Sequence, residues 1–200
     1  MMDVTNLNAV MAKYPQSFSD EKGDSIKDKG WCYGVWYCGT SFQKAKLYGQ
    51  YPPTFLKRAV ALFPHAKRIL HAPSGSLMDL PEGHITLDMH FDDVRKPMFQ
   101  GDCAEMPFAD NSFDLVLSDP PYSEEDSRIY GCTKFPEKKF LSECRRVLKP
   151  GGHLGFLAYH YPAYHREDWA LKGLFAVVTG FYRRTRMFSV FENRKQEFDL

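Results

Sequence analysis

The chain has 200 residues, a length that fits one domain and can bury about 70% of its unfolded surface in a single core. Its formal net charge is +1, with 44% apolar and 15% aromatic residues, which excludes a disordered chain and a strongly basic nucleic-acid coat protein. No apolar run approaches the ~18 residues of a membrane span, and the first ten residues lack the cationic and apolar parts of a signal peptide. A soluble, cytoplasmic protein without a membrane partner is expected.

The five cysteines are odd in number and scattered, which is a poor disulfide framework. Only Cys32 and Cys38 lie close together, and no second Cys or His pair accompanies them to form a zinc site. Reduced thiols and no bound metal are therefore predicted.

Two segments at the start of the chain differ sharply in composition. Residues 20–29 carry seven charges and no aromatic, so residues 1–30 are expected to be a partly mobile segment and residues 31–200 a single domain. From Trp31 to Tyr51 the chain has seven aromatics in 21 residues. This density indicates either packing over a sheet edge or a lid whose rings stack on a planar ligand.

The remaining elements follow from apolar spacing. A first helix is predicted over 53–63, with Pro53 suited to its first turn. Short apolar runs bounded by Gly, Pro or Asp then predict strands at 68–71, 85–88, 98–101, 113–118 and 153–159. A second helix over 140–148 is expected to stop at Pro150-Gly151-Gly152.

This alternation predicts an α/β fold with a Rossmann-like, doubly wound and mainly parallel sheet. Two β-rich runs at 175–182 and 187–192 predict a C-terminal antiparallel hairpin that closes one sheet edge. Only 13 residues separate Gly75 from Asp88 and Asp88 from Gly101, so the early helices are expected to be single turns or missing.

The strongest chemical signal is Asp119-Pro120-Pro121-Tyr122, which directly follows the strand expected at 113–118. Ligands bind beyond the carboxyl ends of strands in such sheets. The Asp119 carboxylate and the Pro120 carbonyl can each accept an N–H of an exocyclic amino group. Pro120 and Pro121 hold the turn rigid, and Tyr122 offers a ring on which a planar base can stack. These acceptors would stabilise the positive charge that develops when nitrogen attacks carbon.

Three elements in this order resemble the class I S-adenosylmethionine-dependent methyltransferases, and among them the amino-methyltransferases with a D-P-P-Y motif. The elements are the segment 101–114, the motif Asp119 to Tyr122 and the segment 141–152. The resemblance covers about half the chain, from Tyr51 to Tyr159. It implies S-adenosylmethionine as the cofactor and Asp119, Pro120, Pro121 and Tyr122 as the catalytic residues.

The resemblance also implies a cofactor site at the ends of the first three strands of the methyltransferase-like sheet. His71 and the loop with Pro73, Gly75 and Ser76 would hold the methionine part, with Gly75 permitting close backbone approach. Asp88 would bind the ribose hydroxyls, and Asp102, Cys103 and Ala104 would contact adenine. This sequence departs from the family at His71, where an acid is usual, and at Leu77, where a glycine is usual.

The charge pattern bears on the acceptor substrate. Residues 105–126 contain seven acids and no base, which would repel phosphates. The terminal hairpin has a net charge of +4, so a nucleic-acid backbone could lie there while a flipped base reaches inward. The candidate substrate residues are Tyr122, Ser123, His160, Arg183, Arg184 and Arg186.

The function predicted from these observations is methyl transfer from S-adenosylmethionine to an exocyclic amino nitrogen of a nucleobase, with adenine in DNA as the first choice. About 40 residues follow the last parallel strand, too few for a target-recognition domain, so duplex reading would need a partner subunit or a homodimer. There are three alternatives. The methyl acceptor could be an RNA base, or it could be a small molecule or nucleotide. The chain could also be a non-catalytic interaction protein on a degenerate methyltransferase fold.

Overall fold

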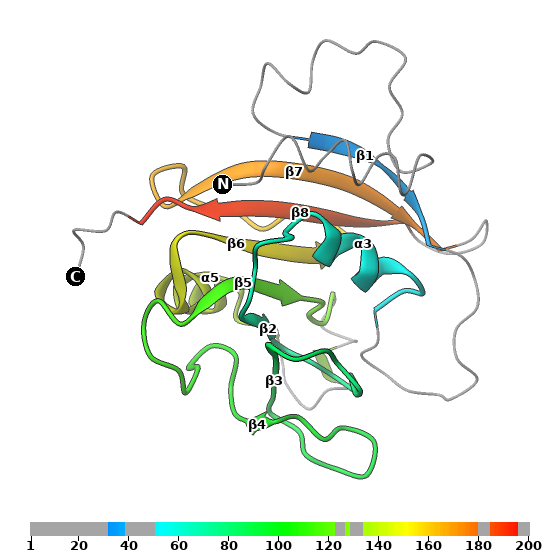
Figure 1. Cartoon of the computed structure of the whole chain (residues 1–200), viewed down its shortest axis with the longest axis vertical. Coiled ribbons are helices and arrows are strands. Elements are labelled where there is room, and N and C mark those ends of the chain that lie inside the picture. The colour runs from blue at the N-terminus through cyan, green and yellow to red at the C-terminus, as the bar shows by residue number, and fades with distance from the viewer. Residues whose placement is uncertain (1–31, 39–50, 123–126, 129–133, 180–184, 196–200) are drawn as a thin grey trace.

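A computed structural model describes residues 32–38, 51–122, 127–128, 134–179 and 185–195 (Figure 1). The predicted mobile segment 1–30 lies outside these residues, as do Trp31, Phe42 and Tyr48 of the aromatic segment. The described residues form one eight-stranded sheet in the order β1-β7-β8-β6-β5-β2-β3-β4. All pairings are parallel except those of β8 with β6 and with β7.

The strands occupy most of the positions that the apolar runs predicted. They are β1 Cys32–Tyr37, β2 Ile69–His71, β3 His84–Asp88, β4 Phe99–Gln100, β5 Phe113–Ser118, β6 Leu148–Ala158, β7 Trp169–Val178 and β8 Arg186–Asn193. The predicted doubly wound, mainly parallel sheet and its antiparallel β7–β8 pair are confirmed.

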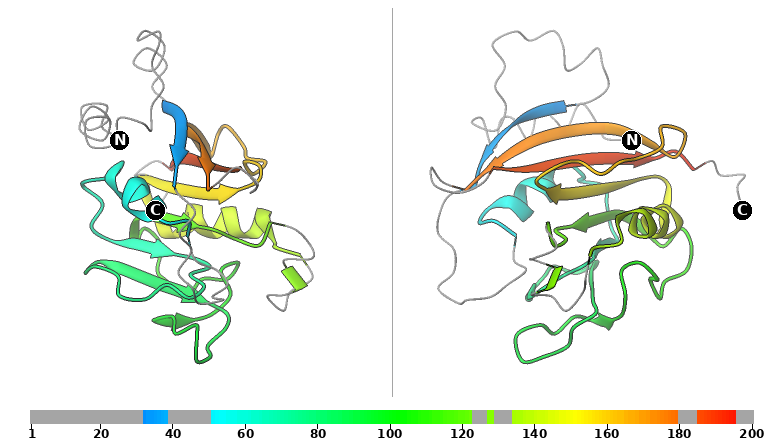
Figure 2. Two further views of the ribbon diagram at one scale, coloured as in Figure 1. Left: turned by 90° about the vertical axis from the view of Figure 1, so that its right-hand side faces the viewer. Right: turned by 180° about the vertical axis from the view of Figure 1, so that it is seen from behind.

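Two helices cover opposite faces of the sheet (Figures 1 and 2). On one face α3 (Phe55–Ala61) buries Phe55 and Ala59 in the core cluster that includes Leu115 of β5. On the other face α5 (Glu137–Val147) buries Phe140 in a second core cluster that includes Val116, the next residue of β5. Successive strand residues point to opposite faces, so the continuous apolar run of β5 serves both cores.

The edge beyond the hairpin is formed by β1, which pairs in parallel with β7. The prediction that the hairpin closes a sheet edge is therefore wrong, because β1 adds a strand outside it. Trp36 of β1 is fully buried and stacks on Phe175 with ring centroids 4.5 Å apart. For this part of the aromatic segment, the interpretation as packing at a sheet edge is confirmed.

The two early crossovers contain no helix, as their length predicted. Residues 72–83 join β2 to β3, and residues 89–98 join β3 to β4, through turns alone. Without helices, this end of the sheet leaves large apolar side chains exposed: Met78, Met89, Phe91, Val94, Met98 and Phe99.

The end of α5 differs from the prediction. The helix ends at Val147, and Leu148 is already extended and begins β6, so Pro150-Gly151-Gly152 lies inside a strand. Gly151 has φ of 70°, a left-handed value that glycine adopts without a steric cost. The helix thus passes directly into the strand at Leu148.

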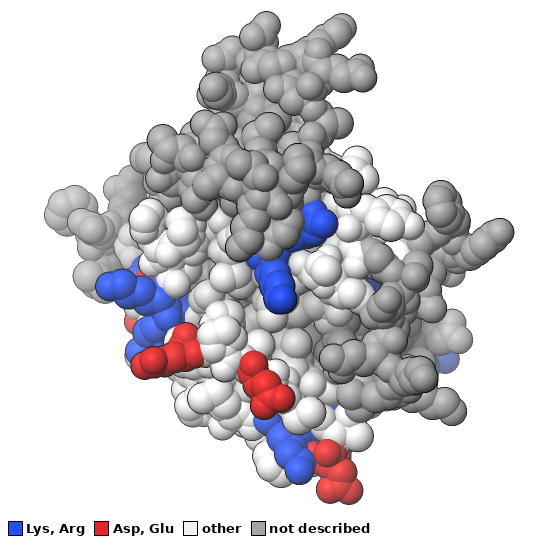
Figure 3. Space-filling view, turned by 45° about the vertical axis from the view of Figure 1, so that its right-hand side comes forward, with Lys and Arg blue, Asp and Glu red and all other residues white. Residues whose placement is uncertain are grey.

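None of the helices formed by described residues combines the length and apolar character needed to span a membrane. On the face shown in Figure 3, basic and acidic side chains of the described residues lie intermixed along the lower edge, with no continuous basic surface there.

Candidate active site

A cavity of about 230 Å³ lies where the strand order reverses, between the ends of β2 and β5. Parallel strands end at a common edge, and loops diverge on either side of the point at which the order reverses. The cavity is lined by Pro73, Gly75, Asp88, Met89, His90, Gly101, Asp102, Cys103, Asp119, Pro121, Lys134, Phe135 and Pro136. The ends of β2, β3, β4 and β5 thereby bring together seven predicted cofactor or catalytic residues: Pro73, Gly75, Asp88, Asp102, Cys103, Asp119 and Pro121.

Asp88 ends β3 and is almost fully buried against the cavity. One of its carboxylate oxygens accepts the backbone N–H of Gly75 at 2.8 Å, and the other accepts that of His90 at 3.0 Å. Each carboxylate oxygen has a second lone pair, so both can still accept hydroxyl groups. These two acceptor oxygens suit the two ribose hydroxyls that the resemblance assigns to this acid.

Asp102 begins the loop after β4 and accepts the backbone N–H of Ala104 at 2.8 Å. Asp102 and Cys103 line the cavity, whereas Ala104 is buried and does not. This arrangement leaves the second oxygen of Asp102 available to an amino group at the cavity wall.

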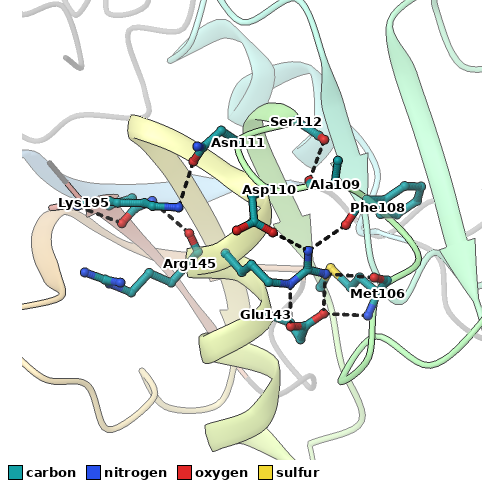
Figure 4. A network of polar contacts seen from close by, with 11 residues as sticks. Met106, Phe108, Ala109, Asp110, Asn111, Ser112, Glu143, Arg145 and Lys195 are labelled. Carbon is teal, nitrogen blue, oxygen red and sulfur yellow. Dashed lines mark hydrogen bonds and ion pairs between the residues drawn. The ribbon is translucent and has the colours of Figure 1, made fainter. Parts of the chain in front are cut away.

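The loop after Asp102 is fixed to α5 by Arg146, and Figure 4 shows Glu143 of the same helix beside Met106 of this loop. Its guanidinium donates to the carbonyls of Met106 and Phe108 at 2.9 and 2.7 Å and forms ion pairs with Glu143 and Asp110 at 2.8 Å. Glu143 in turn accepts the backbone N–H of Met106 at 2.7 Å. Glu143 and Arg146 belong to the segment 141–152 that carries part of the family resemblance. Their side chains thus hold the loop that contains Asp102 in place.

Asp119 follows β5 and lies at the same cavity, with a side chain only 11% exposed. Arg186 approaches Oδ2 with Nη1 at 3.4 Å, and Oδ1 is buried without a hydrogen-bond partner among the described residues. Burial raises the pKa of Asp119 to about 7, against the opposing effect of the Arg186 guanidinium. At pH 7 Asp119 is therefore ionised in about half of the protein molecules, and its carboxyl can take up or release a proton near neutral pH.

Tyr122 lies next to a larger groove of about 800 Å³ that also includes Pro120, Ser127, Lys138, Lys139 and His160 in its walls. The groove shares Pro121, Lys134, Phe135 and Pro136 with the cavity, so the two spaces adjoin. The Tyr122 ring contacts the Tyr159 ring at 4.6 Å between centroids. The exposed side chain of His160 is paired with Glu137 at 3.4 Å.

His71 does not line the cavity, although it ends β2 beside it. It is fully buried, with Nδ1 3.2 Å from the Tyr51 hydroxyl and Nε2 2.9 Å from Nδ1 of His84. Burial and His84 lower its pKa to about 3, so it is neutral at pH 7. In place of the family's acid, the structure has a neutral hydrogen-bonded histidine. Ser76 is also buried outside the cavity wall.

The charged residues of the sequence prediction do not gather as expected. Asp110 and Asp114, two of the acids expected at the mouth, pair with Arg146 and Lys149 and do not line the cavity. Arg186 faces Asp119 instead of an open surface. Ser123, Arg183 and Arg184 lie outside the described residues.

Sequence reasoning missed several cavity residues. Met89, His90 and Gly101 adjoin predicted site residues in the chain, and this adjacency was the available signal. Phe135 and Pro136 precede α5, and their place at the cavity depends on how that helix packs, which no local pattern shows. The described residues contain no group of three or more His, Cys, Asp or Glu that could hold a metal ion.

Residues 77–156 match a family model described as a methyltransferase domain. A phthiotriol/phenolphthiotriol dimycocerosates methyltransferase of Mycobacterium leprae is 37% identical over 90 residues, 44% of this chain and 30% of that protein. The Mycobacterium ulcerans protein named phthiotriol/phenolphthiotriol dimycocerosates methyltransferase 2 is 44% identical over 57 residues, 28% of this chain and 19% of that protein. The chain thus matches less than a third of the length of either relative.

Among solved structures, the Escherichia coli protein yhhF is similar with a TM-score of 0.50 and 12% identity, covering 75% of this chain and 91% of that chain. These findings confirm the class I, Rossmann-like methyltransferase fold and S-adenosylmethionine as the cofactor. The amino-methyltransferase type and the roles of the individual site residues stay predictions.

Proposed function

We propose that this protein transfers a methyl group from S-adenosylmethionine to an exocyclic amino nitrogen of a nucleobase, with adenine in DNA as the first candidate. The observation that carries the proposal is Oδ1 of Asp119, which is buried, has no hydrogen-bond partner among the described residues and lies at a cavity shared with Asp88 and Asp102. An unpaired buried acceptor costs about 1 to 3 kcal/mol, which an N–H donor from an acceptor substrate would recover.

The cofactor, when bound, supplies the methyl group; Asp88 would accept from its ribose and Asp102 from its adenine. Gly75 has φ of 56°, and its N–H is already turned to Asp88, so the loop backbone is held close to the cavity. These contacts come from the ends of β2, β3 and β4, whereas Asp119 follows β5. Cofactor binding and acceptor binding thus depend on different residues.

At the acceptor amine, Oδ1 of Asp119 and the Pro120 carbonyl each accept one N–H. Both interactions strengthen as the nitrogen becomes pyramidal and positive, so they stabilise the transition state more than the bound amine. After transfer the nitrogen carries a proton that it must lose. The Asp119 carboxylate, with a pKa of about 7, is placed to receive it.

A nucleic-acid substrate is supported by Lys138 and Lys139, which line the groove beside Tyr122. Sequence-specific reading would then come from a partner subunit or a second copy of the chain.

A second candidate acceptor is a small-molecule or nucleotide amine. The observation that favours it is the surroundings of Tyr122, whose ring is contacted both by Tyr159 and by the Arg186 guanidinium at 5.2 Å. With these neighbours in place, a base cannot stack on the same ring face as the guanidinium.

The test compares Asp119→Ala with the unsubstituted chain in two measurements. Calorimetry with S-adenosylhomocysteine should give affinities within a few-fold, because Asp119 is not among the cofactor contacts. Transfer of radiolabelled methyl groups to mixed DNA, RNA, nucleosides and nucleotides should fall by about 10²-fold or more.

The matched control is Asp88→Ala, which should weaken S-adenosylhomocysteine binding by about 5- to 150-fold, equivalent to 1 to 3 kcal/mol. Transfer by Asp119→Ala at the parental rate would refute the proposed role of the motif. Labelling of nucleosides but not polymers would favour the second candidate.

A further inference from the structure

Arg186 reaches the proposed site of the methyl acceptor because β8 runs antiparallel to its neighbours β6 and β7. The parallel strands end at the cavity edge, whereas β8 begins there, with Met187 opposite Ala158 near the end of β6. The Arg186 side chain extends from this first position of β8 towards Asp119, which follows β5 on the far side of β6. Its side chain is 21% exposed and lies over the Tyr122 ring.

The two oxygens of Asp119 therefore have different surroundings. Oδ2 faces a guanidinium nitrogen at 3.4 Å, and Oδ1 has no hydrogen-bond partner among the described residues. A guanidinium is planar and permanently charged, so it can hold one oxygen of a carboxylate without transferring a proton to it. The oxygen that stays unpaired is the one left for an incoming N–H.

The charge of Asp119 also depends on this neighbour. Burial alone favours the neutral carboxylic acid, whose hydroxyl would donate to an amine instead of accepting from it. The other titratable groups near Asp119 or on the same cavity, among the described residues, are Tyr51, Asp88, His90, Asp102, Cys103 and Lys134. Among the described residues, Arg186 alone forms an ion pair with Asp119.

We propose that Arg186 is the positioning residue of Asp119: its guanidinium holds Oδ2 and leaves Oδ1 to accept from the amino group of the acceptor. This inference rests on the proposed function and deepens it. Because the carboxylate is already balanced by one cation, the site disfavours an alkylammonium acceptor and suits an uncharged amino group conjugated to a ring.

The experiment follows the titration of Asp119 without cofactor or acceptor. The unsubstituted chain, Arg186→Gln and Arg186→Lys are each compared with the same chain carrying Asp119→Asn, by urea unfolding between pH 5 and pH 9. Within each pair, the stability difference changes with pH until Asp119 is ionised in the folded chain, so the pH at which the difference becomes constant marks the midpoint of the Asp119 titration in the folded state.

Arg186→Gln should move this midpoint upward by about 1 pH unit or more, since an opposite charge within 4 to 6 Å lowers a carboxyl pKa by about 1 to 3. Arg186→Lys, which keeps the charge, should move it less. The control is Arg194→Gln just beyond the other end of β8, where Nη1 donates to the Arg166 carbonyl and the midpoint should not change.

An Arg186→Gln midpoint equal to that of the control would overturn the inference, whatever the activity of the chain. Failure of the unsubstituted chain to methylate any acceptor would instead refute the proposed function. The two failures are read from separate measurements and are therefore distinguishable.

Discussion

Replacement of Asp119 by asparagine is expected to stabilise the folded protein while lowering its activity. Asparagine keeps the shape and one carbonyl oxygen but cannot ionise. The Asp119 carboxyl has a pKa of about 7 in the folded chain against an ordinary value of 3.8, because it is buried. The folded state therefore binds more protons than the unfolded state between these two values, and stability falls as the pH rises from about 4 to about 7.

The magnitude follows from the difference of about 3 between the two pKa values. At 1.36 kcal/mol for each pH unit, ionised Asp119 costs about 4 kcal/mol of folding free energy above pH 7. This pKa already includes the attraction of the Arg186 guanidinium, so no separate offset for the ion pair applies. Asp119→Asn should thus gain about 4 kcal/mol at pH 8 and little at pH 4.

Urea unfolding of both chains between pH 4 and pH 8 measures this difference directly. Asp114→Asn is a matched control on the same strand, where Lys149 and two backbone N–H groups hold the pKa of the carboxyl below its usual range. A lowered pKa stabilises the folded state at pH values above 3.8, so this variant should lose stability at pH 8. An Asp119→Asn chain that is less stable than the parent at pH 8, or equally changed at pH 4, would refute the reasoning.

Two further predictions concern the supports of the site. Arg146→Gln should lower the free energy of unfolding by about 2 kcal/mol and weaken S-adenosylhomocysteine binding several-fold in calorimetry, because the loop that carries Asp102 loses its anchor to α5. His71→Asn should reduce acid destabilisation: the folded pKa of about 3 lies below the unfolded value of 6.5, so the native chain loses stability as the pH falls between them. Between pH 7 and pH 4.5 the free energy of unfolding should fall by about 2 to 3 kcal/mol less in the variant than in the unsubstituted chain. An equal fall in both chains would contradict the buried, neutral state of His71.

The positions of Asp88, Asp102 and Asp119 could be predicted from the sequence because each follows a short apolar run. Such runs become buried strands, and the residue after each run lies at the edge where parallel strands end. The 13-residue spacings likewise predicted crossovers without helices, since too few residues remain for a helix and two turns. These conclusions depend on local patterns and chain length alone.

The partners of His71 and Arg186 could not be predicted in this way. His71 meets Tyr51, 20 residues earlier, and Arg186 meets Asp119, 67 residues earlier, so neither pairing has a local signature. The outer position of β1 beside β7 is equally non-local, because it joins residues about 140 positions apart. The sequence predicted that α5 continues to residue 148, whereas the helix ends at Val147. The reason is that Leu148 already pairs with β5 as part of β6, which extends the backbone there.

The sequence by itself determined the alternation of strands and helices, the fold class, and the carboxylates placed at the strand ends, because hydrophobic periodicity and turn residues act over a few positions. Only the tertiary structure decided which oxygen of Asp119 has no hydrogen-bond partner among the described residues and which cation lies beside the other oxygen. Both depend on β8 running antiparallel across β6, which brings the start of a late strand to the ends of earlier ones. The chemistry of a carboxylate is set by the charges and solvent around it, and these come from whatever the folded chain packs there.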